Sequence, residues 1–187
     1  MKTVLVGAIA IYRSVIQNPH SIIENIETSH SNLWTRSKTL RKPEPEIIGN
    51  QRANVVSDFR TSSEILNLPK DVDSELDMYF KQAVSDYVCR FNAPIIRHES
   101  AYVLLKYEVG QEFQPHHDDS PETPRRVSVV AFLNDNFKGG QLAFDLANFT
   151  YEPVAGDIVV FPSNFPYMHA SRPIIEGTKY SVVSWWI

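Results

Sequence analysis

The sequence predicts a mainly β protein with supporting α-helices, in which the second half of the chain forms a jelly-roll core. From Glu99 onward, short runs rich in β-branched and aromatic residues follow one another, separated by glycine and proline. No pattern of helical length interrupts them, which favours an antiparallel sandwich or barrel over a parallel sheet with crossover helices. The expected strands lie within AYVLLKYEV, RRVSVVAFLN, GGQLAFDL, GDIVVFPS and KYSVVSWWI.

The first half of the chain has a mixed α and β texture. The apolar run from Val4 to Ile11 predicts a buried strand, and Asn18–Ser29 predicts a short helix. The segment Arg36–Asp58 contains prolines, a glycine and many charges, which predicts a long exposed loop. The strongest helical pattern covers Asp71–Phe91, and we expect it to pack on a sheet. Its apolar positions are Leu76, Tyr79, Phe80, Val84 and Val88.

Length and composition bound the domain organisation and the compartment. A chain of 187 residues predicts one domain, residues 1–187, with 1–98 as a mixed buttress and 99–187 as the core. The net charge of −4 disfavours nucleic acid or an anionic membrane as a partner, although a local basic groove stays compatible with it. Cys89 is the only cysteine, so no internal disulfide is expected and a cytoplasmic location is favoured. The N-terminal apolar run is too short for a signal peptide or a membrane span.

The stretch YEVGQEFQPHHDDS offers two histidine–acid pairs, His116 with Asp118 and His117 with Asp119. Such a pair alone proves little, because six histidines and 22 acids give roughly 0.7 of them by chance. A third ligand is available in His169, which antiparallel pairing could bring opposite the pair. Two imidazoles and one carboxylate suit the facial triad of non-haem Fe(II), but zinc accepts the same ligands with one water.

Lys179 lies ten residues beyond His169, in an expected strand. If that strand forms, Lys179 shares a face with Ser181, Val183 and Trp185, because side chains alternate. A lysine among apolar neighbours is unfavourable unless it meets an anion, and a dicarboxylate would supply one. Taken alone, Lys179 would by default be interpreted as a surface lysine on an edge strand.

The second half of the chain resembles the Fe(II)/2-oxoglutarate-dependent dioxygenases, and most closely the prolyl 4-hydroxylase family. The family pattern has Tyr-x-x-Gly-x-x-aromatic-x-x-His-x-Asp, then Gly-Gly, then Gly-Asp before an apolar strand, and finally spaced His, Pro, Gly and Lys. These spacings select His116 and Asp118, and leave His117 and Asp119 as neighbours that are solvated or at the mouth of the site. The matching residues are Tyr107, Gly110, Phe113, His116, Asp118, Gly139, Gly140, Gly156, Asp157, His169, Pro173, Gly177 and Lys179.

The resemblance implies a double-stranded β-helix in which His116, Asp118 and His169 are the catalytic residues and hold Fe(II). The co-substrate 2-oxoglutarate would pair with Lys179 and accept a hydrogen bond from Tyr107. The enzyme would use O2, with ascorbate as an optional further cofactor, and would hydroxylate prolyl residues of a peptide or protein with release of succinate and CO2. Arg60, in the segment RTSS, and Trp185 resemble substrate-binding positions, although Trp185 fits core packing equally well.

The chain departs from the family pattern in two places that border the expected pocket. Gln141-Leu142 stands where the family often has Glu-Thr, and Ala170, Ser171 and Arg172 stand where small glycines often follow the distal histidine. These departures leave the substrate open. Arg172 could be a second anion contact, but we favour a surface charge, because exposed arginines are common.

Trp186 should face the core, and Arg125 and Ser128 match positions of the barrel framework. Two polar segments, Arg36–Asp58 and DSPETPRR, could act as lids.

Other functions remain compatible with these residues. The same chemistry could act on a free amino acid, another side chain or a nucleobase, or the chain could be a catalytically silent metal-binding β-barrel module. A silent module has no physical need for a complete triad and Lys179, which disfavours that alternative. The sequence does not indicate the oligomeric state.

Overall fold

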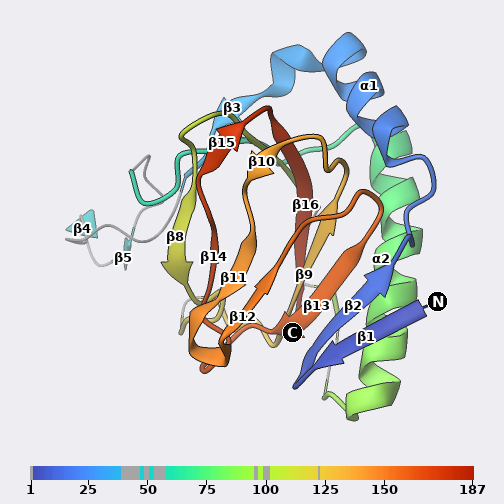
Figure 1. Ribbon diagram of the computed structural model, residues 1–187, viewed down its shortest axis with the longest axis vertical. Coiled ribbons are helices and arrows are strands. Elements are labelled where there is room, and N and C mark those ends of the chain that lie inside the picture. Colours follow the sequence, from blue (N-terminus) through green and yellow to red (C-terminus); the bar gives the residue numbers. More distant parts are fainter. Residues whose placement is uncertain are drawn as a thin grey trace.

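Two facing antiparallel sheets form the body of the protein, with two helices on the outer side of the larger sheet (Figure 1). The computed structural model describes residues 2–38, 58–94, 97–98, 102–121 and 123–187, together with the backbone of 47–48 and 51–52. The larger sheet has the order β1 (Lys2–Val6), β2 (Ile9–Arg13), β13 (Ile158–Pro162), β9 (Val127–Phe132), β16 (Lys179–Trp186), β7 (Val103–Tyr107), β6 (Ser63–Ile65) and β3 (Thr35–Arg36). The smaller sheet has the order β12 (Phe149–Tyr151), β11 (Leu142–Phe144), β14 (His169–Ser171) and β8 (Phe113–His116).

Short elements complete the described fold. The two-stranded pairs are β10 (Lys138–Gly139) with β15 (Ile174–Glu176), and β4 (Ile47–Ile48) with β5 (Gln51–Arg52). The helices are α1 (Pro19–Ser29) and α2 (Lys70–Phe91), and single 3-10 turns cover Ser31–Leu33 and Asp145–Ala147. This arrangement confirms the mainly β fold with a jelly-roll core.

The central strand β9 shows why the sequence forms two packed layers. All six of its residues are buried, because both faces of the larger sheet are covered. Val129 and Ala131 face the helices, whereas Val130 and Phe132 face the smaller sheet. Between the sheets, Phe132 meets Leu142 and Phe144 in one apolar cluster. A short continuous apolar run is the pattern expected of a strand that is buried on both sides.

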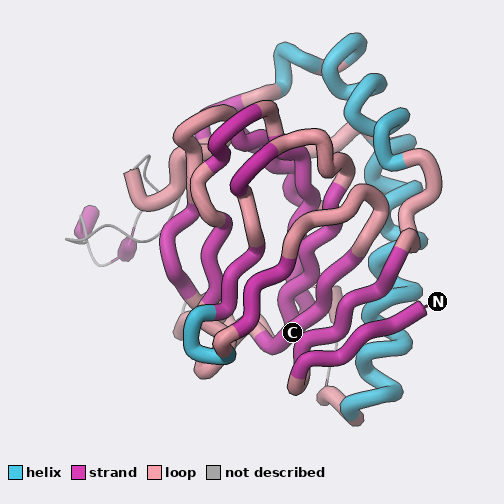
Figure 2. Tube along the Cα trace, viewed as in Figure 1, coloured by secondary structure: helices cyan, strands magenta, loops and turns pink. Residues whose placement is uncertain are grey.

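Helix α2 closes the outer face of the larger sheet, as Figure 2 shows, and confirms the helix expected over Asp71–Phe91. Acidic residues in its first turn and Arg90 in its last turn suit the two ends of the helix dipole. Asn92 ends the helix in the left-handed conformation that asparagine tolerates. Leu76 and Phe80 are fully buried against the sheet, and the Phe80 ring packs against Tyr102 and Trp186.

Helix α1 confirms the short helix expected near residues 18–29, and polar contacts tie it to the sheet. Glu27 accepts hydrogen bonds from Lys106 Nζ at 2.8 Å and from the Tyr180 hydroxyl at 2.7 Å. Lys106 and Tyr180 belong to the paired strands β7 and β16. The helix is therefore attached to the strand that carries Lys179.

The N-terminal expectation was wrong in one respect. The run Val4–Ile11 is a hairpin of β1 and β2 joined at Gly7 and Ala8, instead of one buried strand. Gly7 has φ of +58°, which a residue without a Cβ adopts readily, so the chain reverses there. Only β2 is buried, because it pairs with both β1 and β13, whereas β1 lies at the sheet edge.

Three of the four short strands of the smaller sheet lie outside the strands expected from the sequence, whereas β11 lies within GGQLAFDL. β8, β12 and β14 contain three or four residues each and carry histidine, proline or polar residues, so they lack the long β-branched runs that the pattern required. His169 follows β13 in the chain and is itself the first residue of β14. The expected loop Arg36–Asp58 lies largely outside the described residues. In the part of the chain that the structure describes, no helix is long and apolar enough to cross a bilayer.

We expect Phe80→Ala to destabilise the protein by about 3–5 kcal/mol, because it empties a fully buried site between α2 and the sheet. Urea denaturation followed by circular dichroism measures this change. The matched control is Met78→Ala on the same helix, whose side chain is 58% exposed and whose replacement should change stability by less than about 0.5 kcal/mol. Equal effects of the two substitutions would contradict the assigned packing of α2.

Candidate active site

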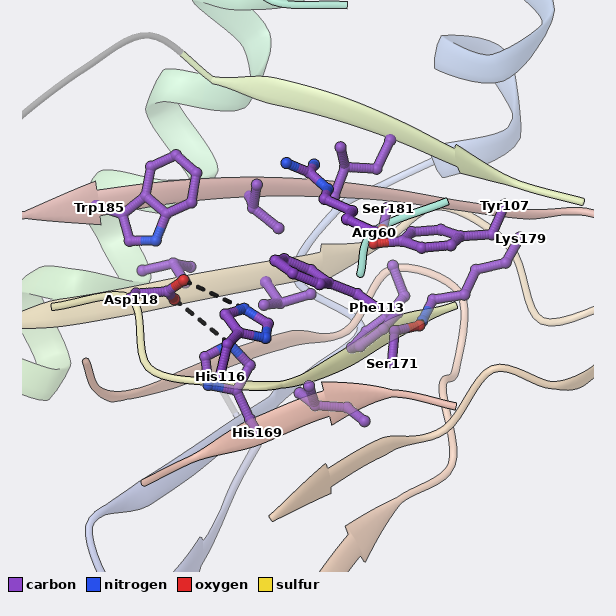
Figure 3. A pocket seen from close by; sticks show the side chains of 16 residues that line it. Arg60, Tyr107, Phe113, His116, Asp118, His169, Ser171, Lys179, Ser181 and Trp185 are labelled. Atoms are coloured by element: carbon purple, nitrogen blue, oxygen red, sulfur yellow. Dashed lines mark hydrogen bonds and ion pairs between the residues drawn. The ribbon is translucent and has the colours of Figure 1, made fainter. Parts of the chain in front are cut away.

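The pairing of β8 with β14 places His116 directly opposite His169. Their rings lie 4.3 Å apart between centroids, although the residues are 53 positions apart in the chain. Asp118 lies two residues beyond β8, where its backbone N–H donates to the Ser163 carbonyl at 3.1 Å. That hydrogen bond holds the chain so that the Asp118 carboxylate reaches both imidazoles (Figure 3).

The three side chains are close enough to share one metal ion. Asp118 Oδ1 lies 3.4 Å from His116 Nε2, and Asp118 Oδ2 lies 3.4 Å from His169 Nε2. Two donors at right angles, each about 2.1 Å from an ion, are separated by about 3 Å. Small side-chain adjustments would therefore bring all three donors onto one ion. Among the described residues, this is the one group of at least three such side chains placed to do so.

Hydrogen bonds orient both imidazoles for this role. His116 Nδ1 lies 2.8 Å from the Gln114 carbonyl, and His169 Nδ1 lies 3.2 Å from the Tyr167 carbonyl. A carbonyl only accepts, so each Nδ1 carries the hydrogen and each Nε2 presents its lone pair to the centre.

Ser128, the second residue of β9, holds the carboxylate in the same way. Its hydroxyl donates to Asp118 Oδ2 at 2.6 Å, and its oxygen also lies 2.7 Å from the Ser163 hydroxyl.

The charge states of Asp118 and His169 also suit the binding of a metal cation. Burial opposes ionisation of Asp118, but the neighbouring imidazoles and Ser128 outweigh it and hold the pKa of the carboxyl well below its ordinary value. Burial, helped by His116, lowers the pKa of His169 to about 4. At neutral pH the site therefore offers an ionised carboxylate and a neutral imidazole, the forms that bind metals.

The structure leaves the second histidine–acid pair out of this cluster. His117 is half-buried beside it, and Asp119 Oδ1 accepts a hydrogen bond from the Arg125 backbone at 3.1 Å. The backbone turns after His116, so consecutive residues point in different directions. The geometry therefore agrees with the register that the glycine and aromatic spacing selected.

Lys179 is 2% exposed at the inner end of the same pocket. Its ammonium donates to the Gly140 carbonyl at 2.7 Å and to Ser171 Oγ at 2.8 Å. No carboxylate of the described residues pairs with it, and burial lowers the pKa of Lys179 to about 7. The face shared with Ser181, Val183 and Trp185 lines the pocket, as strand alternation predicted.

Tyr107 lies directly across from Lys179 in the β7–β16 pairing, and the ammonium sits 5.2 Å from the centre of its ring. Burial raises the pKa of Tyr107 despite the nearby Arg60 guanidinium, so its hydroxyl stays protonated and can donate. Arg60 is also buried, where it pairs with Glu64 at 3.3 Å and lies 5.0 Å from the centre of the Phe113 ring. Tyr107 and Arg60 thus form one wall of the pocket (Figure 3).

A single pocket joins the His–Asp–His cluster to Lys179. It encloses about 530 Å³, part of it open to solvent, and apolar side chains make up much of its wall. Trp185 lines the pocket and is half-buried, and the Arg125 guanidinium stacks 3.7 Å from the centre of one of its rings. Trp186 points to the opposite face and is buried under α2, as expected.

Two residues near the site have roles that the sequence left open or missed. Arg172 turns away from the pocket and pairs with Asp145 at the surface, in keeping with the surface charge that we favoured. Ser128 was assigned only to the barrel framework, yet it contacts Asp118 directly. Its position in an otherwise apolar buried strand was the signal for a polar partner.

The comparison with protein families bears on the part of the chain that carries this site. Residues 102–187 match the model of the 2OG-Fe(II) oxygenase superfamily, and this range contains the His–Asp–His cluster, Tyr107 and Lys179. This part of the chain is therefore similar to the 2OG-Fe(II) oxygenases, which are oxidoreductases. The chain is also similar in sequence to proteins named prolyl 4-hydroxylases.

Two curated relatives carry that name. The chain is 28% identical over 123 residues to a putative prolyl 4-hydroxylase of Acanthamoeba polyphaga mimivirus, covering 54% of this chain and 50% of the relative. It is 24% identical over 189 aligned residues to the probable prolyl 4-hydroxylase 9 of Arabidopsis thaliana, covering 86% of this chain and 62% of the relative. The chain therefore spans about half to three fifths of the length of these relatives.

Solved structures share the fold. A viral collagen prolyl hydroxylase of Paramecium Bursaria Chlorella virus-1, in complex with 2OG, superposes with a TM-score of 0.68 at 14% identity, over 96% of this chain and 95% of that chain. A prolyl hydroxylase of Trichoplax adhaerens, in complex with a hypoxia inducible factor peptide fragment, superposes with a TM-score of 0.73 at 17% identity, over 96% and 83%. These similarities confirm the double-stranded β-helix.

The chain should bind one divalent ion at the His–Asp–His cluster, and His169→Ala should weaken binding by roughly a hundredfold or more, because it removes one of three ligands. Calorimetric titration with Mn²⁺ measures this. The matched control is His117→Ala, which removes an adjacent imidazole that lies outside the cluster and should leave the affinity within about threefold. Stronger dependence on His117 than on His169 would contradict the assigned register.

Proposed function

We propose that this protein is an Fe(II)- and 2-oxoglutarate-dependent dioxygenase that hydroxylates prolyl residues of a peptide or protein, with release of succinate and CO2. The observation that carries the proposal is the pocket itself, in which a His–Asp–His cluster and a buried lysine without a carboxylate partner among the described residues face the same space. A metal site alone would not need Lys179, and a structural lysine would not need the cluster.

His116, Asp118 and His169 would hold the iron through one face, which leaves adjacent positions for co-substrate and oxygen. Bound Fe(II) with 2-oxoglutarate supplies the activation of O2 that hydroxylation of an unreactive C–H bond requires. The ligands themselves fit this use, because the Nδ1–H groups and Ser128 fix their orientation. Zinc would accept the same ligands, but the superfamily whose model residues 102–187 match is named for iron.

Lys179 would bind the carboxylate of 2-oxoglutarate that lies far from the metal. Its ammonium is already oriented by Gly140 and Ser171, so binding requires little rearrangement of the side chain. Tyr107 would donate a hydrogen bond from its protonated hydroxyl. The apolar wall, which includes Leu105, Val130 and Phe132, would keep water away from the reacting centre.

The substrate would enter between Trp185 and Arg60, which line the pocket beside the metal cluster. Trp185 offers a half-buried aromatic face, which suits packing against a pyrrolidine ring. The charge of Arg60 is balanced by Glu64, so we expect it to contact the substrate through hydrogen bonds more than through net charge. The similar proteins named above, one of them in complex with a peptide, support a peptide or protein as substrate.

The single cysteine, Cys89, is in keeping with a reducing compartment such as the cytoplasm.

We expect the protein to form succinate from 2-oxoglutarate with Fe(II), O2 and a proline-containing peptide library, and to add one oxygen to proline. His169→Ala should lose turnover by at least about a hundredfold, because it removes a proposed iron ligand. Mass spectrometry of peptides and succinate measures both. His20→Ala, an exposed histidine on α1, serves as the control with parental activity. Oxygen added only to other side chains or to a nucleobase would redirect the proposal, and full activity of His169→Ala would exclude the triad.

The affinity for 2-oxoglutarate should fall as pH rises above about 7. Burial holds the pKa of Lys179 at about 7 in the free protein, so at pH 8 the side chain is mostly in the neutral amine form. A bound carboxylate favours the charged form and raises this pKa, so binding at pH 8 takes up a proton. Below pH 7 the lysine is already charged and the affinity should level off.

Calorimetry at pH 8, in buffers with different ionisation enthalpies, measures the proton uptake. We expect close to one proton for the parent and none for Lys179→Arg, whose guanidinium stays charged. The affinity of the parent should decrease by up to about tenfold per pH unit above 7. Binding without proton uptake and without this pH dependence would contradict the role of Lys179.

A further inference from the structure

The two departures of this chain from the prolyl 4-hydroxylase pattern lie opposite each other in the smaller sheet. Leu142 of β11 pairs directly with Ser171 of β14, and both side chains line the pocket. The pattern often has threonine at the position of Leu142 and small glycines after the distal histidine. This chain therefore lacks a hydroxyl on β11 and carries one directly across, on β14.

Ser171 contacts the ammonium group of Lys179, which would bind the co-substrate in the proposed function. Its Oγ lies 2.8 Å from Lys179 Nζ, and the residue is 9% exposed. An ammonium only donates, so Ser171 Oγ accepts this hydrogen bond and keeps its own hydrogen for another acceptor. Lys179 Nζ donates a second hydrogen bond to the Gly140 carbonyl, so one of its three N–H groups is left to donate to a ligand.

The surroundings fix the position of this pair. Gly140 has φ of +67°, and a Cβ there would lie 2.6 Å from Ile174 Cδ1 and 3.1 Å from Lys179 Cδ. The absence of a side chain at Gly140 thus leaves room for the stem of Lys179 beside Ile174. One remaining ammonium hydrogen and the Ser171 hydroxyl hydrogen form a two-point donor set, which matches the two oxygens of a carboxylate.

We propose that Ser171 is a co-substrate-binding residue that donates a hydrogen bond to the distal carboxylate of 2-oxoglutarate, beside Lys179. The family pattern often has a threonine hydroxyl on β11, at the position of Leu142. In this chain the Ser171 hydroxyl, on the neighbouring strand β14, would replace it. This inference rests on the proposed function, because it assumes that 2-oxoglutarate occupies the pocket.

Calorimetric titration of the whole chain, loaded with Mn²⁺ in place of iron, tests the contact without turnover. Two ligands are compared: 2-oxoglutarate, and 2-oxovalerate, which has the same five-carbon chain with a methyl group instead of the distal carboxylate. Ser171→Ala should weaken 2-oxoglutarate binding by roughly tenfold or more and leave 2-oxovalerate binding within about twofold. Adding Leu142→Thr to Ser171→Ala should recover most of the lost affinity, because it returns a hydroxyl to the same cross-strand pair.

The control is Ser184→Ala, which removes another buried serine hydroxyl of the larger sheet, on the face turned to α2 and His98. It should leave the affinity for both ligands unchanged. Equal weakening of both ligands by Ser171→Ala would show a structural role and overturn the proposal, as would no weakening at all. No 2-oxoglutarate binding by the Mn²⁺-loaded parent would overturn the proposed function itself, together with this inference.

Discussion

The antiparallel pairing of β8 with β14 is the interaction on which the site depends. It sets His116 opposite His169, and the Ser163 carbonyl then holds Asp118 between them. Both strands are short, and the His169 ring packs against Phe144 and Phe161 of the apolar layer between the two sheets. Shifting the register by one residue would turn both imidazoles away from each other, because side chains alternate along a strand. The core between the sheets therefore also positions the metal ligands.

The second constraint is the burial of a cation without a carboxylate partner among the described residues. Lys179 is covered on all sides, and its ammonium is held only by a carbonyl and a hydroxyl. Burial disfavours the charged form of a lysine, and this is why the pKa of Lys179 is lowered. A bound anion favours the charged form. The proposed binding of a dicarboxylate would therefore depend on the protonation of Lys179.

Much of the site could be read from residue types and spacing. The resemblance of the Tyr107-to-Lys179 series to the prolyl 4-hydroxylase pattern selected the three ligand candidates and the lysine, because residue types alone left two histidine–acid pairs open. Strand alternation placed Lys179, Ser181, Val183 and Trp185 on one face, as the structure has them. The N-terminal hairpin was missed, since a single glycine within an apolar run gives little warning of a reversal.

The sequence by itself indicated the candidate ligands and the β-strands of the core, since both follow from residue types and their spacing. Only the tertiary structure decided which groups support the residues of the site. Ser128 reaches Asp118 from a different strand, and Ser171 reaches Lys179 across the pocket. These contacts span only 10 and 8 positions of the chain, but they depend on sheet pairing and twist, which leave no fixed spacing in the sequence.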